Sequence, residues 1–265
     1  MILTLLLLGS LFTAEPVLSD IRFAGADGRP VKAFLVRPSG AVAGAPAILF
    51  AHWLEPGSPD SNRTQFLAQA LDLARDGVVS LLPEMMWSDP EWFNRRDPAQ
   101  DYDASVRQAA DLGKALDYLL AQAGVDPKRV AFVGHDFGMM CGLLLSHTDK
   151  RPTAWALQAG TGAFEDWYLY GRARLPEAEK QKVRERLQPL APLRFIGGLS
   201  APVLLQFGTA DPHVPMPRAR ALSSAAGGVK RTLYYEAGHG LNEAAVKDRM
   251  AWLREVLRIT PVEKN

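Results

Sequence analysis

Three polar residues, Asp136, Asp211 and His239, have the types and the order expected of a nucleophile, an acid and a base. Asp136 is the central residue of the segment 134–138 (GHDFG), which follows four strand-forming residues and precedes a small, apolar segment. This order predicts a strand, a tight turn and a helix, the arrangement that exposes the serine of Gly-x-Ser-x-Gly sequences. The residue at the exposed position is here an aspartate.

A carboxylate nucleophile suits a particular chemistry. When aspartate attacks a saturated carbon it forms an ester whose carbonyl belongs to the enzyme, and activated water can hydrolyse that ester. A serine doing the same would form an ether, which water does not readily cleave. We therefore expect Asp136 to open an epoxide or to expel a halide. Attack by Asp136 on an acyl group would give an anhydride and is the alternative.

The base and the acid follow later in the chain. His239 lies between two glycines, where a loop can bring its ring over the nucleophile. We expect His239 to activate the water of the second step, and Asp211 to hold its tautomer and stabilise the imidazolium. Glu165 is the alternative acid. His213 is too close in sequence to Asp211 to serve easily as its partner.

These residues must be positioned by a set of strands and helices. Apolar runs that suit strands covered on both faces lie at 47–51, 78–82, 130–133, 153–159 and 202–207. A first hairpin is expected within 21–36, helices at 62–75, 103–123, 217–226 and 243–257, a last strand at 231–235, and a long loop at 83–101. Alternating strands and helices predict an α/β fold, a mostly parallel sheet with helices on both faces. His52, Asp136, Asp211 and His239 each follow a predicted strand, so they should meet at the carboxyl edge of that sheet.

From about residue 20 to 260, the order of nucleophile turn, acid and histidine resembles the α/β-hydrolase fold. The segments 208–215 (GTADPHVP) and 237–239 (AGH) are similar to the dienelactone-hydrolase-like branch, as is a short insertion at about 160–195 before the acid strand. The segment GHDFG instead resembles that of haloalkane dehalogenases and epoxide hydrolases, which use an aspartate nucleophile. The resemblance implies one α/β-hydrolase domain over residues 20–265.

The resemblance also implies an oxyanion hole, a pair of backbone N–H groups that stabilise the developing negative charge. One donor would be the N–H of Phe137, and the other would come from the turn after His52. In the relatives a glycine usually follows that histidine. Because Trp53 stands there in this chain, Trp53 and Leu54 are both candidates for the second donor.

The leaving group needs its own donors. Dehalogenases usually hold the halide with a tryptophan directly after the nucleophile, where this chain has Phe137, so Trp53 or another tryptophan would have to substitute. Epoxide hydrolases usually protonate the opening oxygen with tyrosines from an inserted cap. The remaining candidates for substrate binding are Trp87, Trp167, Tyr168 and Tyr170. Packing within the insertion is the alternative role for these aromatic residues.

The composition excludes several classes of function. The 265 residues are 48% hydrophobic, and 30 Lys and Arg balance 29 Asp and Glu, so we expect a small-molecule substrate and no nucleic-acid partner. The single cysteine, Cys141, rules out an intrachain disulfide. No His-Glu-x-x-His spacing is present, and 160–162 (GTG) lacks the third glycine of a dinucleotide loop, so we expect neither a metal nor a cofactor. The oligomeric state cannot be read from the sequence.

The first residues differ from the rest. Residues 1–14 (MILTLLLLGSLFTA) are apolar and too short to span a bilayer, which favours a signal peptide over 1–19 and a periplasmic or secreted protein. No Lys or Arg precedes the apolar run. A buried first strand or helix of a cytoplasmic protein is the alternative.

The sequence therefore leaves three hypotheses. The first is a cofactor-independent hydrolase that acts on a small epoxide or organohalide through an ester at Asp136, with His239 and Asp211 activating water. The second is a dienelactone-hydrolase-like carboxylic ester hydrolase or lactonase. The third is a catalytically silent α/β-hydrolase that serves as a binding module.

Overall fold

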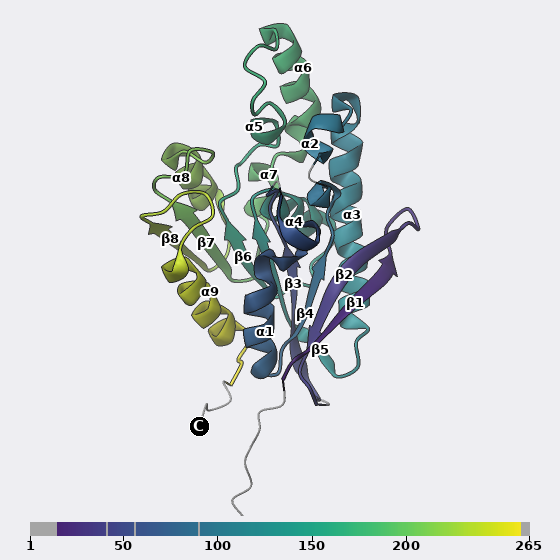
Figure 1. Cartoon of the computed structure of the whole chain (residues 1–265). Coiled ribbons are helices and arrows are strands. Elements are labelled where there is room, and N and C mark those ends of the chain that lie inside the picture. The colour runs from purple at the N-terminus through teal and green to yellow at the C-terminus, as the bar shows by residue number, and fades with distance from the viewer. Residues whose placement is uncertain (1–14, 41, 56, 90, 261–265) are drawn as a thin grey trace, which may run out of the picture.

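The computed structural model describes residues 15–40, 42–55, 57–89 and 91–260 (Figure 1). Most of the expected signal segment lies outside these residues, although Val17 to Ser19 already belong to the first strand. The strands are β1 Val17–Ala24, β2 Pro30–Arg37, β3 Ala45–Ala51, β4 Val79–Pro83, β5 Val125–His135, β6 Ala154–Gln158, β7 Val203–Gly208 and β8 Lys230–Tyr235. The α-helices are α1 Leu67–Arg75, α2 Trp92–Arg95, α3 Asp101–Leu120, α4 Phe137–Thr148, α5 Glu165–Tyr168, α6 Glu177–Leu187, α7 Leu193–Ile196, α8 Met216–Ala225 and α9 Glu243–Val256.

The strands form one eight-stranded sheet in the order β1-β2-β4-β3-β5-β6-β7-β8. β1 and β2 form the expected antiparallel hairpin, and β2 also pairs antiparallel with β4. All remaining pairs are parallel. The expected mostly parallel sheet is thus confirmed.

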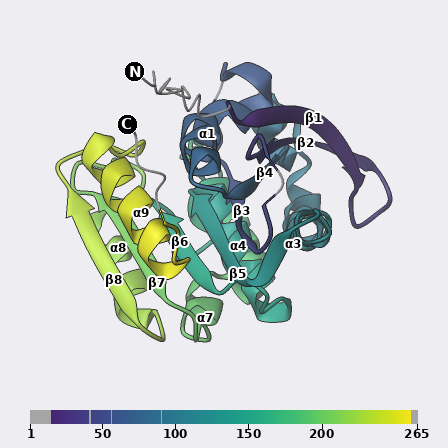
Figure 2. The same cartoon turned by 90° about the horizontal axis from the view of Figure 1, so that it is seen from below.

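Helices cover both faces of the sheet, which is why its central strands are apolar along their whole length. β3, β4, β6 and β7 are buried at every residue. One core joins the sheet to α3, α4 and α8, and a second core joins the opposite face to α1 and α9. Figure 2 shows α1 and α9 on one side of the sheet and α3 and α4 on the other.

One expected helix boundary is wrong because of the backbone conformation that precedes it. The helix expected over 62–75 begins only at Leu67, after the 3₁₀ segment η1 Pro59–Phe66. Asp60, Ser61 and Asn62 have positive φ angles of 47°, 54° and 66°, which an α-helix of L-residues does not accommodate.

The expected loop over 83–101 is also wrong in part. It contains α2 and two 3₁₀ turns, η2 Met86–Ser88 and η3 Pro98–Gln100. The insertion after β6 contains α5, α6, the 3₁₀ turn η4 Gln188–Leu190 and α7. Within the described residues, no helix is long and apolar enough to cross a membrane.

Candidate active site

Asp136 lies in the turn between β5 and α4 with φ 55° and ψ −121°. A non-glycine residue in this region costs roughly 1–3 kcal/mol and is held there by its surroundings. Its backbone N–H donates to the carbonyl of Gln158 at 2.9 Å. A Cβ on Gly138 would lie 2.1 Å from the carbonyl oxygen of Ala51, and one on Gly134 would lie 2.8 Å from backbone atoms of α4. Both glycines are therefore required by the turn.

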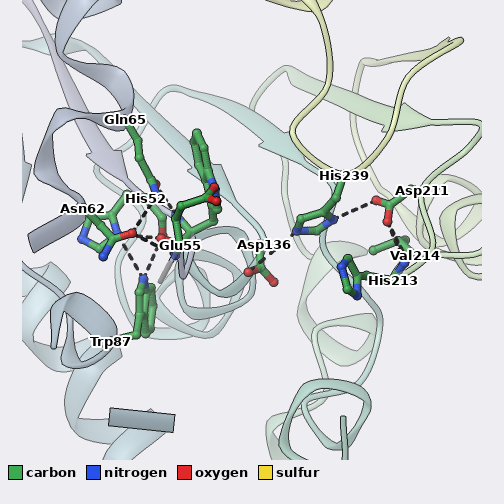
Figure 3. Close-up of polar contacts among 11 residues, drawn as sticks. His52, Glu55, Asn62, Gln65, Trp87, Asp136, Asp211, His213, Val214 and His239 are labelled. Atoms are coloured by element: carbon green, nitrogen blue, oxygen red, sulfur yellow. Dashed lines mark hydrogen bonds and ion pairs between the residues drawn. The ribbon is translucent and has the colours of Figure 1, made fainter. Parts of the chain in front are cut away.

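The structure brings Asp136, Asp211 and His239 together at the carboxyl ends of β5, β7 and β8 (Figure 3). His239 Nδ1 lies 2.9 Å from Asp211 Oδ2, and its Nε2 lies 3.9 Å from Asp136 Oδ2. The other Asp211 oxygen accepts from the backbone N–H groups of His213 and Val214 at 2.8 and 3.1 Å. The two backbone N–H groups thus orient the Asp211 carboxylate, and that carboxylate orients the ring of His239.

Asp136, Asp211 and His239 shift one another's pKa values. Burial alone would lower the pKa of His239, but its contacts with Asp136 and Asp211 raise that pKa to about 9. Burial would raise the pKa of Asp211, yet His239 and the two backbone N–H groups hold it below its usual value. Burial raises the pKa of Asp136, against the opposing effect of His239. The pKa directions of His239 and Asp211 favour an imidazolium paired with the Asp211 carboxylate, whereas burial favours the neutral form of Asp136.

The backbone N–H groups of Leu54 and Phe137 lie near the carboxylate of Asp136 and oppose the rise of its pKa. Trp53 does not supply such a donor, because its backbone N–H donates to Gln65 Oε1 at 2.9 Å. Its indole N–H donates to Glu55 at 2.8 Å. The expectation for Trp53 is corrected accordingly, and Leu54 is the remaining candidate in its turn.

A pocket of about 410 Å³ opens above Asp136 and His239. Its walls include Phe93, Asn94, Trp167, Tyr170 and His213. Trp167 is nearly buried, whereas Tyr170 is half exposed. The walls come from the loop after β4, from the insertion and from the loop after β7, so the pocket joins three distant parts of the chain.

Two of the four aromatic residues expected to bind substrate do not line this pocket. Trp87 is fully buried behind Phe137, and its indole N–H points at His52, 3.2 Å from the carbonyl oxygen. Tyr168 is buried with its hydroxyl 2.8 Å from that of Ser105. Both side chains pack the wall from behind, which is the packing role that the sequence left open.

The pocket also contains residues that the sequence did not indicate. His213 was set aside because of its closeness to Asp211, but its ring lies 5.0 Å from that of His239. The contact between His213 and His239 depends on the conformation of the loop after β7, and no residue spacing in the sequence predicts it. Glu165, the alternative acid, does not line the pocket, and the carboxylate that contacts His239 is that of Asp211. Among the described residues, no group of three His, Cys, Asp or Glu is arranged to hold a metal ion.

Known structures share this architecture. An acetyl xylan esterase from a Paenibacillus species matches with a TM-score of 0.74 at 18% identity, over 95% of this chain and 87% of that one. A protein from Klebsiella pneumoniae assigned as a dienelactone hydrolase matches with a TM-score of 0.68 at 16% identity, over 93% and 100%. A prolyl endopeptidase matches with a TM-score of 0.71 at 21% identity, over 93% of this chain and 39% of that one. These likenesses show the expected α/β-hydrolase fold.

A comparison with curated protein sequences gave no match. Residues 97–260 match the prolyl oligopeptidase family, and this segment includes Asp136, Asp211 and His239. Since the matched segment is more than half of the chain, the protein is a hydrolase of the α/β-hydrolase fold that belongs to the prolyl oligopeptidase family.

Proposed function

We propose that the protein hydrolyses small carboxylic esters or lactones, with Asp136 as the nucleophile. The observation that supports this proposal is the small number of indole and tyrosine side chains in the wall of the pocket. Among the described residues that line it, Trp167 is the one indole and Tyr170 the one tyrosine. The paired indoles that would hold a halide and the paired tyrosines that would protonate an epoxide are both incomplete, because Trp87 and Tyr168 lie behind the wall.

The similar proteins also support ester hydrolysis. Oligopeptidases cleave an acyl bond, and two of the similar structures are described as an acetyl xylan esterase and a dienelactone hydrolase. Substrates of all three kinds present a carbonyl carbon to the nucleophile. The size of the pocket, about 410 Å³, suits a small ester or lactone.

The first step uses the ionised form of Asp136 and the protonated form of His239. The Asp136 carboxylate attacks the ester carbonyl and forms a mixed anhydride, while the bond to the alcohol oxygen breaks. The imidazolium of His239, 3.9 Å from Asp136, donates a proton to the departing alkoxide. The His239 proton thus leaves with the alcohol product.

The second step follows from the change in charge. Once Asp136 is acylated it is neutral, so the largest contribution that raises the pKa of His239 is removed. The neutral ring then takes a proton from water, which hydrolyses the anhydride. The products are the carboxylic acid and the regenerated Asp136 carboxylate beside an imidazolium, so protons balance over the cycle.

Opening of a small epoxide is a second candidate, favoured by a different observation. The N–H groups of Leu54 and Phe137 lie near the carboxylate of Asp136 itself. In an alkyl ester at Asp136 they would polarise the carbonyl that belongs to the enzyme, which water must attack. In this reaction His239 would donate its proton to the epoxide oxygen.

The first experiment tests the nucleophile with 4-nitrophenyl esters, whose leaving group needs no acid. We expect turnover by the wild type, a single burst of nitrophenolate with His239→Gln, and neither with Asp136→Asn. Capture of the acyl group by hydroxylamine should modify Asp136 in the His239→Gln protein. His147→Gln is the matched control, because His147 contacts Phe195 far from the pocket and should leave turnover unchanged.

The second experiment separates the candidates by mass spectrometry of His239→Gln incubated with small epoxides and haloalkanes. A stable adduct at Asp136 without ester turnover by the wild type would replace the first candidate by the second. Ester turnover that survives Asp136→Asn would overturn the role of Asp136. If nothing is turned over or trapped, yet a ligand raises the melting temperature, the protein is a binding module.

A further inference from the structure

Three aromatic rings meet above Asp136, and each has a nitrogen without a hydrogen-bond partner. The ring centroids of His239 and Trp167 lie 5.3 Å apart, those of His239 and His213 lie 5.0 Å apart, and those of Trp167 and His213 lie 5.4 Å apart. The atoms Trp167 Nε1, His213 Nδ1 and His239 Nε2 are buried and lack a partner within the described part of the chain. The three unpartnered nitrogens thus belong to rings that contact one another.

The reaction steps account for only one of these nitrogens. His239 Nε2 faces Asp136 and carries the proton of the reaction. Trp167 and His213 take no part in either step, and a buried polar group without a partner is unfavourable in free energy. Both residues line the pocket, and Trp167 is only 8% exposed. A substrate that satisfied them would recover this free energy on binding.

The types of the two groups determine what they can bind. An indole N–H is a donor only, so Trp167 requires an acceptor. Burial first, and then the cationic His239, lower the pKa of His213, so its ring is neutral at neutral pH and has one donor nitrogen. Neutral donors in an aromatic wall suit an uncharged oxygen better than a carboxylate or a phosphate.

We propose that Trp167 and His213 bind a second oxygen of the substrate, so that the preferred esters have an ether, hydroxyl or carbonyl oxygen beside the scissile group. This inference rests on the proposed ester hydrolysis and names its substrate class. The second oxygen could belong to the acyl part or to the alcohol part. The two cases share the same chemistry, and the experiment below distinguishes them.

The experiment compares esters in which an oxygen replaces one methylene group. Methyl methoxyacetate against methyl butanoate tests the acyl side, and 2-methoxyethyl acetate against butyl acetate tests the alcohol side. The measured quantity is the ratio of kcat/KM within each pair. Because the oxygen also changes intrinsic reactivity, the change in this ratio between wild type and variant is compared rather than the ratio itself.

Trp167→Phe removes the N–H and keeps an aromatic ring, and His213→Phe does the same for the imidazole. We expect each variant to lower the ratio for one of the two pairs roughly 3- to 10-fold, as the loss of one hydrogen bond does. The pair affected shows which side of the ester carries the oxygen. Trp92→Phe is the matched control, since Trp92 packs against Phe137 outside the pocket and should leave both ratios unchanged.

Ratios that stay the same in both variants would overturn the proposal. An equal loss for both members of a pair would also overturn it, because Trp167 or His213 would then act on the ester group itself. If the wild type hydrolyses none of the four esters, the proposed function fails while this inference can still be tested. The esters are then stable ligands, and their Kd values from calorimetry give the same comparison.

Discussion

His239 carries a proton because it lies between two carboxylates, 2.9 Å from Asp211 and 3.9 Å from Asp136. The contact with Asp136 is the largest contribution that raises its pKa, and burial opposes it. Asp136 is therefore the residue that contributes most to the protonated state of His239. A serine at this position would leave the histidine neutral over a wider range of pH, which is what a general base in the first step requires.

Asp136→Asn should lower the pKa of His239 from about 9 towards the usual 6.5. The reason is that the substitution removes a negative charge and keeps the size of the side chain. Titration of the His239 ring protons by NMR measures this pKa, with His147 as the internal reference. A value that stays near 9 in the variant would show that Asp211 alone holds the proton.

The same pKa makes the stability of the fold depend on pH. The pKa of His239 is higher in the folded state, about 9, than the 6.5 expected when unfolded. Its contribution is therefore complete below about pH 6.5 and is lost as the pH rises through about 9, by up to ~3 kcal/mol. Urea unfolding between pH 6 and 10 measures this loss, which should be smaller in Asp136→Asn. An equal loss in both proteins would assign it to other groups.

That Asp136, Asp211 and His239 lie together could be predicted from the sequence, because each one follows a predicted strand of a mostly parallel sheet. The contacts of Trp87, Tyr168 and His213 could not be predicted. They depend on how the loops after β4 and β7 pack against the insertion, and those loops have no periodic pattern. A sequence pattern does not distinguish an aromatic ring that is buried in the core from one that lines a pocket.

At the scale of the elements, the turn from β5 to α4 depends on close approach between backbones. Gly138, the second residue of α4, lies directly against the end of β3, and a Cβ there would lie 2.1 Å from the carbonyl oxygen of Ala51. This contact holds the helix start next to the strand that leads to Leu54. Both backbone donors near Asp136 therefore depend on one glycine.

Gly138→Ala should destabilise the protein by about 3 kcal/mol and reduce activity, because backbone atoms must move to admit the methyl group. Gly113→Ala is the matched control in α3, where the nearest atom to a new Cβ is a leucine methyl group at 3.6 Å. That variant should be neutral or more stable by up to ~1 kcal/mol, because alanine favours helix. Urea unfolding compares the two, and equal effects would contradict the role given to Gly138.

The buried strands were predictable at this scale because strands covered on both faces are continuously apolar. The start of α1 was not, since Asp60, Ser61 and Asn62 have types that suit a helix N-cap as well as the positive φ angles that they adopt. The short helices between 83 and 101 were missed for a related reason. Segments of three or four residues are too short to show a helical period.

At the scale of the whole molecule, the pocket depends on polar contacts of Arg96 that join the insertion after β6 to the rest of the fold. Arg96 Nε lies 3.1 Å from Asp101, and both side chains are at most 5% exposed. Another Arg96 nitrogen donates to the carbonyl of Tyr168 at 2.7 Å, in the helix that also carries Trp167. One guanidinium thus joins the loop after β4, α3 and α5.

Arg96→Met should destabilise the protein by about 3–5 kcal/mol at pH 8, because it leaves Asp101 buried without its partner. Burial already raises the pKa of Asp101 to about 6 with Arg96 present, so this carboxyl should be protonated at pH 5 in the variant. The loss of stability should accordingly be smaller at pH 5. Urea unfolding at both pH values measures the difference, and Arg96→Met combined with Asp101→Leu should recover most of the stability at pH 8. A loss independent of pH would contradict this account.

The ring of Trp167 lies 5.3 Å from that of His239, and this contact gives the active site an optical signal of its own. A protonated imidazole quenches the fluorescence of a neighbouring indole more strongly than a neutral one does. Emission from Trp167 should therefore rise as His239 loses its proton, whether through alkaline pH or through acylation of Asp136. Stopped-flow fluorescence could then follow the intermediate with colourless substrates, and the signal should disappear in Trp167→Phe.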